Sequence, residues 1–188
     1  IYEDLVGTSY QKISSKGKKI IYDSIVIAYN GHDGQIRKSG EAYIHHPLEV
    51  AKIVSNDIGL FYISIASAIL HDTVEDTATT VDDIKAQFGD RVAKLVSELT
   101  DVSKPEDGNR ATRKGIDRAK LAGVSADAQT IKLADLISNS KSIVKYDPSF
   151  AKVYMDEKRQ LLAVLTKGNS LLRALAQDIV DSYYKNNG

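Results

Sequence analysis

The spacing of apolar residues is the feature that most constrains the fold of this chain. Apolar side chains recur every three or four positions along almost the whole sequence, whereas alternation with a period of two is scarce. Only three prolines, at positions 47, 105 and 148, interrupt this pattern. The pattern predicts an all-α protein. The expected helices span roughly residues 15–30, 47–56, 61–76, 80–87, 90–101, 110–122, 126–146, 149–167 and 169–185.

Size, charge and cysteine content narrow the classes of function. The chain has 188 residues, of which 43% are hydrophobic, which is enough for a single domain over residues 1–188 with a sizeable core. Its 25 Lys and Arg balance 25 Asp and Glu, so there is no overall basic field to hold a nucleic acid. No apolar run approaches the ~20 residues of a membrane-spanning helix. We therefore expect a cytoplasmic protein without nucleic-acid or membrane partners, and a homodimer is one oligomeric state that the sequence allows. The chain has no cysteine, so a metal site would use His, Asp and Glu.

A group of acidic residues and one histidine directly follows the apolar run 61–70. The segment reads His71-Asp72-Thr73-Val74-Glu75-Asp76. On a continuous helix, positions 71, 72, 75 and 76 would fall within an arc of about 140° and share one face. Three acids at the C-terminal end of a helix oppose its dipole. The segment therefore favours a bound cation or a functional proton at this place.

A second candidate ligand is His46, which stands immediately before Pro47. We expect this proline to open a helix and to hold the backbone of His46 in an extended conformation, which limits the directions of its imidazole. A fixed imidazole suits a metal ligand. The neighbouring His45 is instead expected to be an ordinary surface or core histidine.

The segment 128–142 is the third candidate, because its two helical faces differ. The apolar stripe consists of Leu133, Leu136, Ile137 and Val144. The opposite face consists of Asp135, Ser138, Asn139 and Ser142. Solvated faces are normally rich in Lys and Glu, so a face of small polar groups is typical of a cleft wall, with an exposed helix as the alternative.

Four motifs, in this order, resemble the hydrolase domain of the RelA/SpoT homologue superfamily, specifically its stand-alone small alarmone hydrolases, including the metazoan Mesh-type enzymes. They are AYNGHDGQIRKSG at 28–40, YIHHP at 43–47, HDTVEDT at 71–77 and IKLAD at 131–135. The resemblance implies an all-α HD-domain bundle of about eight to ten helices around a single divalent metal, usually Mn²⁺. Iron or zinc also suits two imidazoles and two carboxylates.

The resemblance also assigns roles to residues of this chain. It implies metal ligands at His46, His71, Asp72 and Asp135. It implies that Glu75 and Asp76 divide the work of activating water and protonating the leaving 3′ oxygen, in either order. Substrate binding is expected from Arg37, Lys38, Ser39, Asn139 and Ser142. His32 is expected to brace its loop rather than to bind metal.

The predicted function is hydrolysis of the 3′-pyrophosphate of alarmone nucleotides, (p)ppGpp or (p)ppApp, to GDP or GTP, or the adenosine equivalent, plus pyrophosphate. One alternative is another metal-dependent nucleotide phosphohydrolase, acting for example on NADPH. A non-catalytic nucleotide sensor is the other, although the retained pair Glu75 and Asp76 favours catalysis. The sequence leaves open the preference for guanosine or adenosine and any contact of Arg110, Arg113 or Lys114 with the 5′ phosphates.

Overall fold

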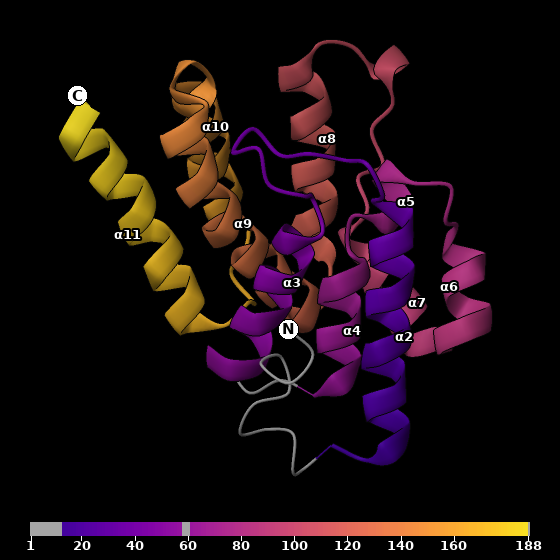
Figure 1. Ribbon diagram of the computed structural model, residues 1–188. Helices are drawn as coiled ribbons and strands as arrows, with labels where there is room; N and C mark the ends of the chain where they lie inside the picture. The colour runs from indigo at the N-terminus through magenta and orange to yellow at the C-terminus, as the bar shows by residue number, and fades with distance from the viewer. Residues whose placement is uncertain (1–12, 58–60, 188) are drawn as a thin grey trace. The chain divides into compact units, whose positions relative to one another are not determined.

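The computed structural model describes residues 13–57 and 61–187 (Figure 1). The chain divides into two compact units, Ile1–Thr100 and Asp101–Gly188. Among the described residues, the regular elements are helices, and the β-type pairing is one isolated bridge between Ile36 and Ala42. The prediction of an all-α fold is confirmed. None of the described helices combines the length and apolarity needed to cross a bilayer.

The first unit is organised around α4, which is apolar and buried from Ser64 to Leu70. Helix α4 packs against α2, α3 and α7, and α6 packs against α7. A helix that is apolar on all sides needs such neighbours to cover it. The elements are α2 (Ser15–Gly31), α3 (His45–Lys52), the π-helical turn η2 (Ile53–Asp57), α4 (Tyr62–Leu70), α5 (Thr73–Asp76), α6 (Val81–Phe88) and α7 (Asp90–Leu99).

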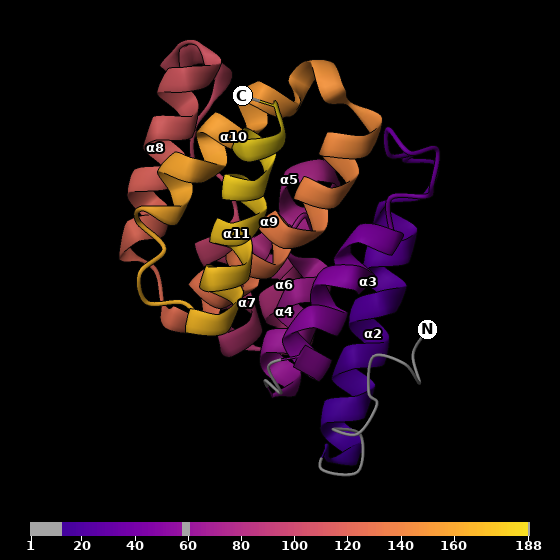
Figure 2. The same cartoon turned by 90° about the vertical axis from the view of Figure 1, so that its left-hand side faces the viewer.

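The second unit is a group of longer helices in which α9, α10 and α11 pack against one another (Figure 2). Gln129 of α9 is fully buried and ties the helix to the loop that follows α10, since its Oε1 accepts from the backbone N–H groups of Lys167 and Gly168 at 2.7 and 3.2 Å. The elements are η3 (Pro105–Asp107), α8 (Arg110–Gly123), α9 (Ala126–Tyr146), α10 (Pro148–Leu162) and α11 (Ser170–Asn187).

The expected continuous helix over 61–76 is wrong, because the chain turns at His71 and Asp72. Helix α4 ends at Leu70 and α5 begins at Thr73. The Thr73 hydroxyl donates a 2.6 Å hydrogen bond to the Leu70 carbonyl, so this acceptor at the end of α4 is satisfied locally. Positions 71, 72, 75 and 76 are therefore divided between a turn and α5, although His71 and Asp72 keep backbone angles in the right-handed helical region.

Three other expectations also need correction. Helix α3 begins at His45, so His46 lies in its first turn rather than in an extended segment. Pro47 is accommodated there because the N–H that it lacks would have no partner inside the helix. Val144 is 38% exposed and does not belong to the core stripe of α9. The helix expected over 149–167 ends earlier, at Leu162.

Candidate functional site

Three of the four predicted metal ligands gather in the first unit. His46, His71 and Asp72 each offer a ligand atom, and these atoms all lie within 4.8 Å of one another. The Oδ2 of Asp72 is 3.1 Å from the Nε2 of His71 and 3.6 Å from the Nε2 of His46. Both histidines are buried, and Asp72 is partly buried. We call these three residues the metal-site cluster.

The backbone positions the metal-site cluster from two directions. His46 projects from the first turn of α3, and His71 and Asp72 occupy the turn between α4 and α5. Helices α3 and α4 pack against each other. The imidazoles of His46 and His71 meet edge to face with their ring centres 5.2 Å apart.

A contact with the backbone fixes the proton on His71. Its Nδ1 lies 2.8 Å from the carbonyl oxygen of Ala68, which can only accept a hydrogen bond. In the neutral ring Nδ1 therefore carries the hydrogen, and Nε2 presents a lone pair toward Asp72. A lone pair facing a carboxylate oxygen at 3.1 Å is repelled unless a proton or a cation lies between them.

Tyr43 is a further member of the site to which the sequence analysis gave no role. Its hydroxyl donates a 2.6 Å hydrogen bond to Oδ2 of Asp72. Its ring centre lies 4.7 Å from that of His32 and 5.8 Å from that of His46. The sequence feature that could have identified Tyr43 is its position three residues before His46 in the same motif. Tyr43 orients the carboxylate of Asp72.

Glu75 and Asp76 lie on α5, directly after the metal-site cluster in the chain. Loss of hydration and the nearby charge of Asp72 raise the pKa of Asp76, while a hydrogen bond from Tyr43 and the proximity of His32 act in the opposite direction. A raised pKa shifts a carboxyl group toward its protonated form, which is the form that a general acid uses.

The loop between α2 and α3 carries the predicted nucleotide-binding residues. Its Arg37 amide donates to the carbonyl of Glu41 at 2.9 Å, which closes a tight turn with Lys38 exposed near its tip. The Ser39 hydroxyl donates to a Glu41 carboxylate oxygen at 3.1 Å.

A pair of side-chain contacts joins this loop to α5. The Nδ1 of His32 is 2.9 Å from Oε1 of Gln35, and Nε2 of Gln35 donates to the backbone carbonyl of Asp76 at 3.0 Å. His32 is 3% exposed. These contacts agree with the prediction that His32 braces the loop.

The remaining predicted residues belong to α9 in the second unit. Asp135 is 5% exposed, and its carboxylate is held by the ammonium of Lys132 at 2.8 Å and by Nδ2 of Asn139 at 2.6 Å. Ser138 is also buried, and Ser142 is partly buried. This burial excludes the alternative of a simple solvent-exposed helix face. The role of Asp135 as the fourth metal ligand stays a prediction.

The sequence matches a known domain family over most of its length. A model of the HD domain matches residues 24–168. The chain belongs to the HD domain family. The match runs across the boundary between the two units at residue 100, while the predicted extent of one domain over residues 1–188 stays a prediction.

Curated relatives of this HD domain include much longer proteins. The guanosine-3′,5′-bis(diphosphate) 3′-pyrophosphohydrolase of Aquifex aeolicus is 37% identical over 134 residues, which are 70% of this chain and 18% of that protein. The protein of the same name from Vibrio cholerae is 31% identical over 165 residues, 86% of this chain and 22% of that protein. A probable GTP pyrophosphokinase of Mycobacterium leprae is 32% identical over 145 residues, 76% of this chain and 18% of that protein. The chain thus spans about a fifth of these relatives.

Solved structures show the same fold over most of this HD domain. A metazoan ortholog of SpoT, described as hydrolysing ppGpp and acting in starvation responses, superimposes with a TM-score of 0.78 at 25% identity and covers 87% of this chain and 95% of that chain. The protein lmo0812 of Listeria monocytogenes superimposes with a TM-score of 0.64 at 25% identity, over 78% of this chain and 98% of that chain. The resemblance to the RelA/SpoT hydrolase domains is confirmed.

The donor set of this HD domain fits a divalent metal ion. The metal-site cluster offers imidazole nitrogens and a carboxylate oxygen, which first-row divalent ions accept. The Nδ1–H of His71 is held by Ala68 and the carboxylate of Asp72 by Tyr43, so two ligands are oriented before a metal arrives. A cation at this place would also remove the repulsion between Nε2 of His71 and Asp72.

Proposed function

We propose that the chain hydrolyses the 3′-pyrophosphate of (p)ppGpp or (p)ppApp, releasing pyrophosphate and leaving GDP or GTP, or the adenosine equivalent. The observation that carries this proposal is the metal-site cluster, with Asp76 of raised pKa beside it, in an HD domain related to proteins named as this hydrolase. We further propose Mn²⁺ as the metal, with Asp135 as the fourth ligand. We also propose a cytoplasmic location for the protein, as expected from the sequence.

The chemistry requires water to attack phosphorus while the bond to the ribose 3′ oxygen breaks. A divalent metal held by the metal-site cluster would make water more acidic and draw charge from the phosphorus. Asp76 protonates the departing 3′ oxygen, and the burial that raises its pKa favours the protonated form that this role needs. Glu75 then orients the water and takes its proton. Tyr43 holds the carboxylate of Asp72 in place throughout.

Substrate binding in this proposal uses the turn at 37–39 and the polar face of α9. Arg37 has a planar cation that can stack on a purine base, and the exposed ammonium of Lys38 attracts the pyrophosphate. Asn139 and Ser142 contact the nucleoside. Because Asn139 also donates to Asp135, substrate binding and the position of that carboxylate are coupled.

The test is a product assay with the purified chain and saturating Mn²⁺ on ppGpp, pppApp, GTP and NADPH. We expect pyrophosphate release from one or both alarmones and none from GTP or NADPH. The Asp72→Asn protein, purified in the same way, serves as the control for contaminating enzymes. Turnover of NADPH or GTP without release of pyrophosphate from either alarmone would contradict the proposal. Binding of an alarmone without turnover would identify the sensor instead.

A further inference from the structure

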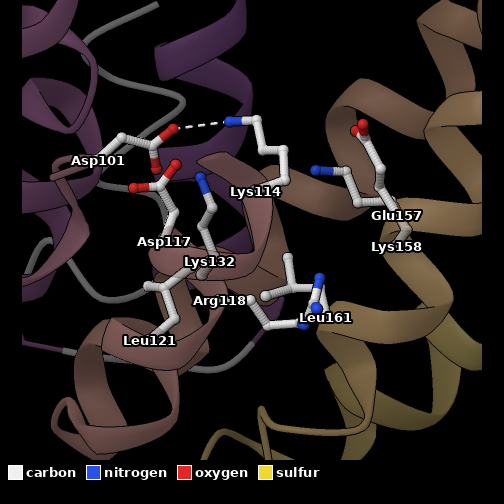
Figure 3. Close-up of a pocket in the computed structure, with 9 residues that line it drawn as sticks. All are labelled: Asp101, Lys114, Asp117, Arg118, Leu121, Lys132, Glu157, Lys158 and Leu161. Carbon is white, nitrogen blue, oxygen red and sulfur yellow. Dashed lines mark hydrogen bonds and ion pairs between the residues drawn. The ribbon is translucent and has the colours of Figure 1, made fainter. Parts of the chain in front are cut away.

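The second unit contains a cavity of about 50 Å³ between α8, α9 and α10 (Figure 3). The volume is enough for about three water molecules, which is room for one phosphate group but not for a nucleotide. Four cations line the cavity, namely Lys114, Arg118, Lys132 and Lys158. Three carboxylates also line the cavity. Whether it attracts an anion therefore depends on which of these charged groups already have partners.

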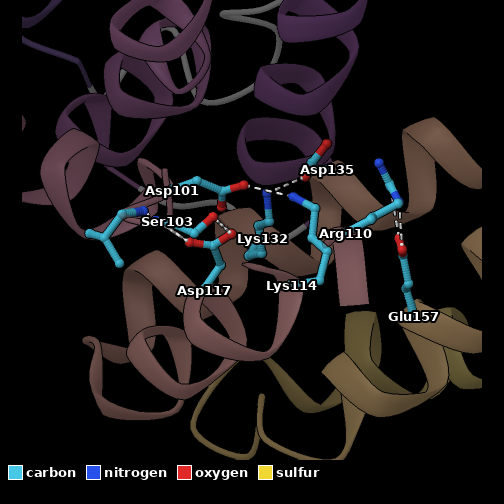
Figure 4. A network of polar contacts seen from close by, with 9 residues as sticks. Asp101, Ser103, Arg110, Lys114, Asp117, Lys132, Asp135 and Glu157 are labelled. Atoms are coloured by element: carbon cyan, nitrogen blue, oxygen red, sulfur yellow. Dashed lines mark hydrogen bonds and ion pairs between the residues drawn. The ribbon is translucent and has the colours of Figure 1, made fainter. Parts of the chain in front are cut away.

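Two of the carboxylates are engaged near the start of the unit. Asp117 accepts from the backbone N–H groups of Val102 and Ser103, each at 2.9 Å, and from the Ser103 hydroxyl at 2.7 Å (Figure 4). Asp101 forms an ion pair of 2.7 Å with Lys114. Both carboxylates therefore have partners, and the charge of Lys114 also acts on Asp117.

The third carboxylate and one further cation are engaged from outside the cavity. Glu157 receives two parallel hydrogen bonds from the guanidinium of Arg110, at 2.7 and 2.9 Å. Lys132 forms an ion pair of 2.8 Å with Asp135, which does not line the cavity.

Arg118 and Lys158 are the cations that remain. Within the stretch of chain that the structure describes, neither forms a hydrogen bond or an ion pair, and both are partly buried. The ammonium of Lys158 lies 4.6 Å from the centre of the Tyr154 ring. Burial of the ammonium, together with repulsion from Lys132, lowers the pKa of Lys158 to about 8, so it is still charged at neutral pH. An anion from solution would stabilise both cations.

We propose that this cavity binds one phosphate group through the guanidinium of Arg118 and the ammonium of Lys158. A guanidinium offers a planar set of donors to phosphate oxygens and an ammonium offers a compact charge, which together are a common means of holding an oxyanion. The phosphate is either free inorganic phosphate or the 5′-phosphate end of a nucleotide. The cavity is built within the second unit, so it would bind phosphate whether or not the chain hydrolyses alarmones.

The experiment follows binding to the isotope-labelled full chain by NMR, with EDTA present so that no divalent metal can hold phosphate. Sodium phosphate is titrated at constant ionic strength, and GDP is titrated separately. We expect saturable shifts of the Lys158 side chain and of α8 and α10. Lys158→Met and Arg118→Met should each weaken binding at least tenfold, as expected for the loss of one charge-assisted contact. The control is Lys152→Met, which removes an exposed lysine of α10 that is paired with Asp156.

The possible results distinguish three cases: a site for free phosphate, a site for the phosphate end of a nucleotide, and no phosphate site. Saturable binding of phosphate with no tighter binding of GDP identifies the free anion. Tighter binding of GDP, displaced by phosphate and weakened by Lys158→Met, identifies the nucleotide end. Shifts that rise linearly without saturation in the wild type, or equal weakening by Lys152→Met and Lys158→Met, would overturn the proposal. Melting curves of both methionine variants verify that they are folded, and either variant alone is sufficient for the test.

Discussion

Replacing Tyr43 by Phe tests whether the metal-site cluster is oriented by a neighbour that does not itself bind metal. The substitution keeps the aromatic ring, which packs between His32 and His46, and removes the hydroxyl that donates to Asp72 at 2.6 Å. A hydrogen bond to a charged group contributes about 1.5–3 kcal/mol. At ~1.4 kcal/mol per factor of ten, metal affinity should fall about 10- to 100-fold.

The affinity is measured by titrating Mn²⁺ against a competing chelator, or by counting free Mn²⁺ from its magnetic resonance signal. Tyr29→Phe is the matched control, because the Tyr29 side chain is 60% exposed on α2 and should leave metal affinity unchanged. The melting temperature of the metal-free Tyr43→Phe protein should change little, since packing of the ring is retained. A Tyr43→Phe protein with wild-type affinity for Mn²⁺ would refute the argument that this hydroxyl orients Asp72.

Three further predictions follow from the same site. Asp72→Asn and His46→Ala should each abolish both metal binding and activity, and elemental analysis of the purified variants counts the bound metal. A variant that keeps full metal content and turnover would show that the substituted residue is not a metal ligand. Glu75→Gln and Asp76→Asn should retain most of the metal but lower turnover by ~10²–10⁴-fold, whereas parallel loss of metal and rate would make these acids structural or ligating. Arg37→Ala should raise KM more than it lowers kcat, because stacking on a base acts about equally before and during the reaction. Steady-state kinetics with ppGpp measure both constants, and a fall in kcat larger than the rise in KM would contradict this role.

The helices were predictable from the sequence because helical periodicity is a local property of the chain. Their ends were less predictable where side chains or neighbouring elements decide them. The π-helical turn after Lys52 extends α3 beyond regular α geometry, and the end of α10 at Leu162 had no proline or glycine beside it as a signal. The exposure of Val144 shows the same limit, since a helical wheel does not reveal which positions other helices cover.

Within the site, residue types singled out His46 and the segment at 71–76 separately, and the resemblance to the RelA/SpoT hydrolase domains implied that His46, His71 and Asp72 are neighbours. The role of Tyr43 was not predictable in that way, because it depends on a contact across 29 positions of the chain. The cavity with Arg118 and Lys158 was missed for a similar reason. Each residue alone is an ordinary helical cation, and only the packing of the second unit places both at one cavity.

The turn at His71 and Asp72 separates α4 from α5 but changes the backbone angles little. His71 keeps right-handed helical backbone angles (φ −59°, ψ −34°), and Asp72 (φ −96°, ψ −7°) stays in the same region. Across this turn Asp72 Oδ2 lies 3.1 Å from His71 Nε2. The cost of the break is limited, because the Thr73 hydroxyl satisfies the Leu70 carbonyl and α5 resumes at once. The short α5 then carries Glu75 and Asp76 directly after the metal-site cluster, so the acids proposed to transfer protons follow Asp72 within four residues of the chain.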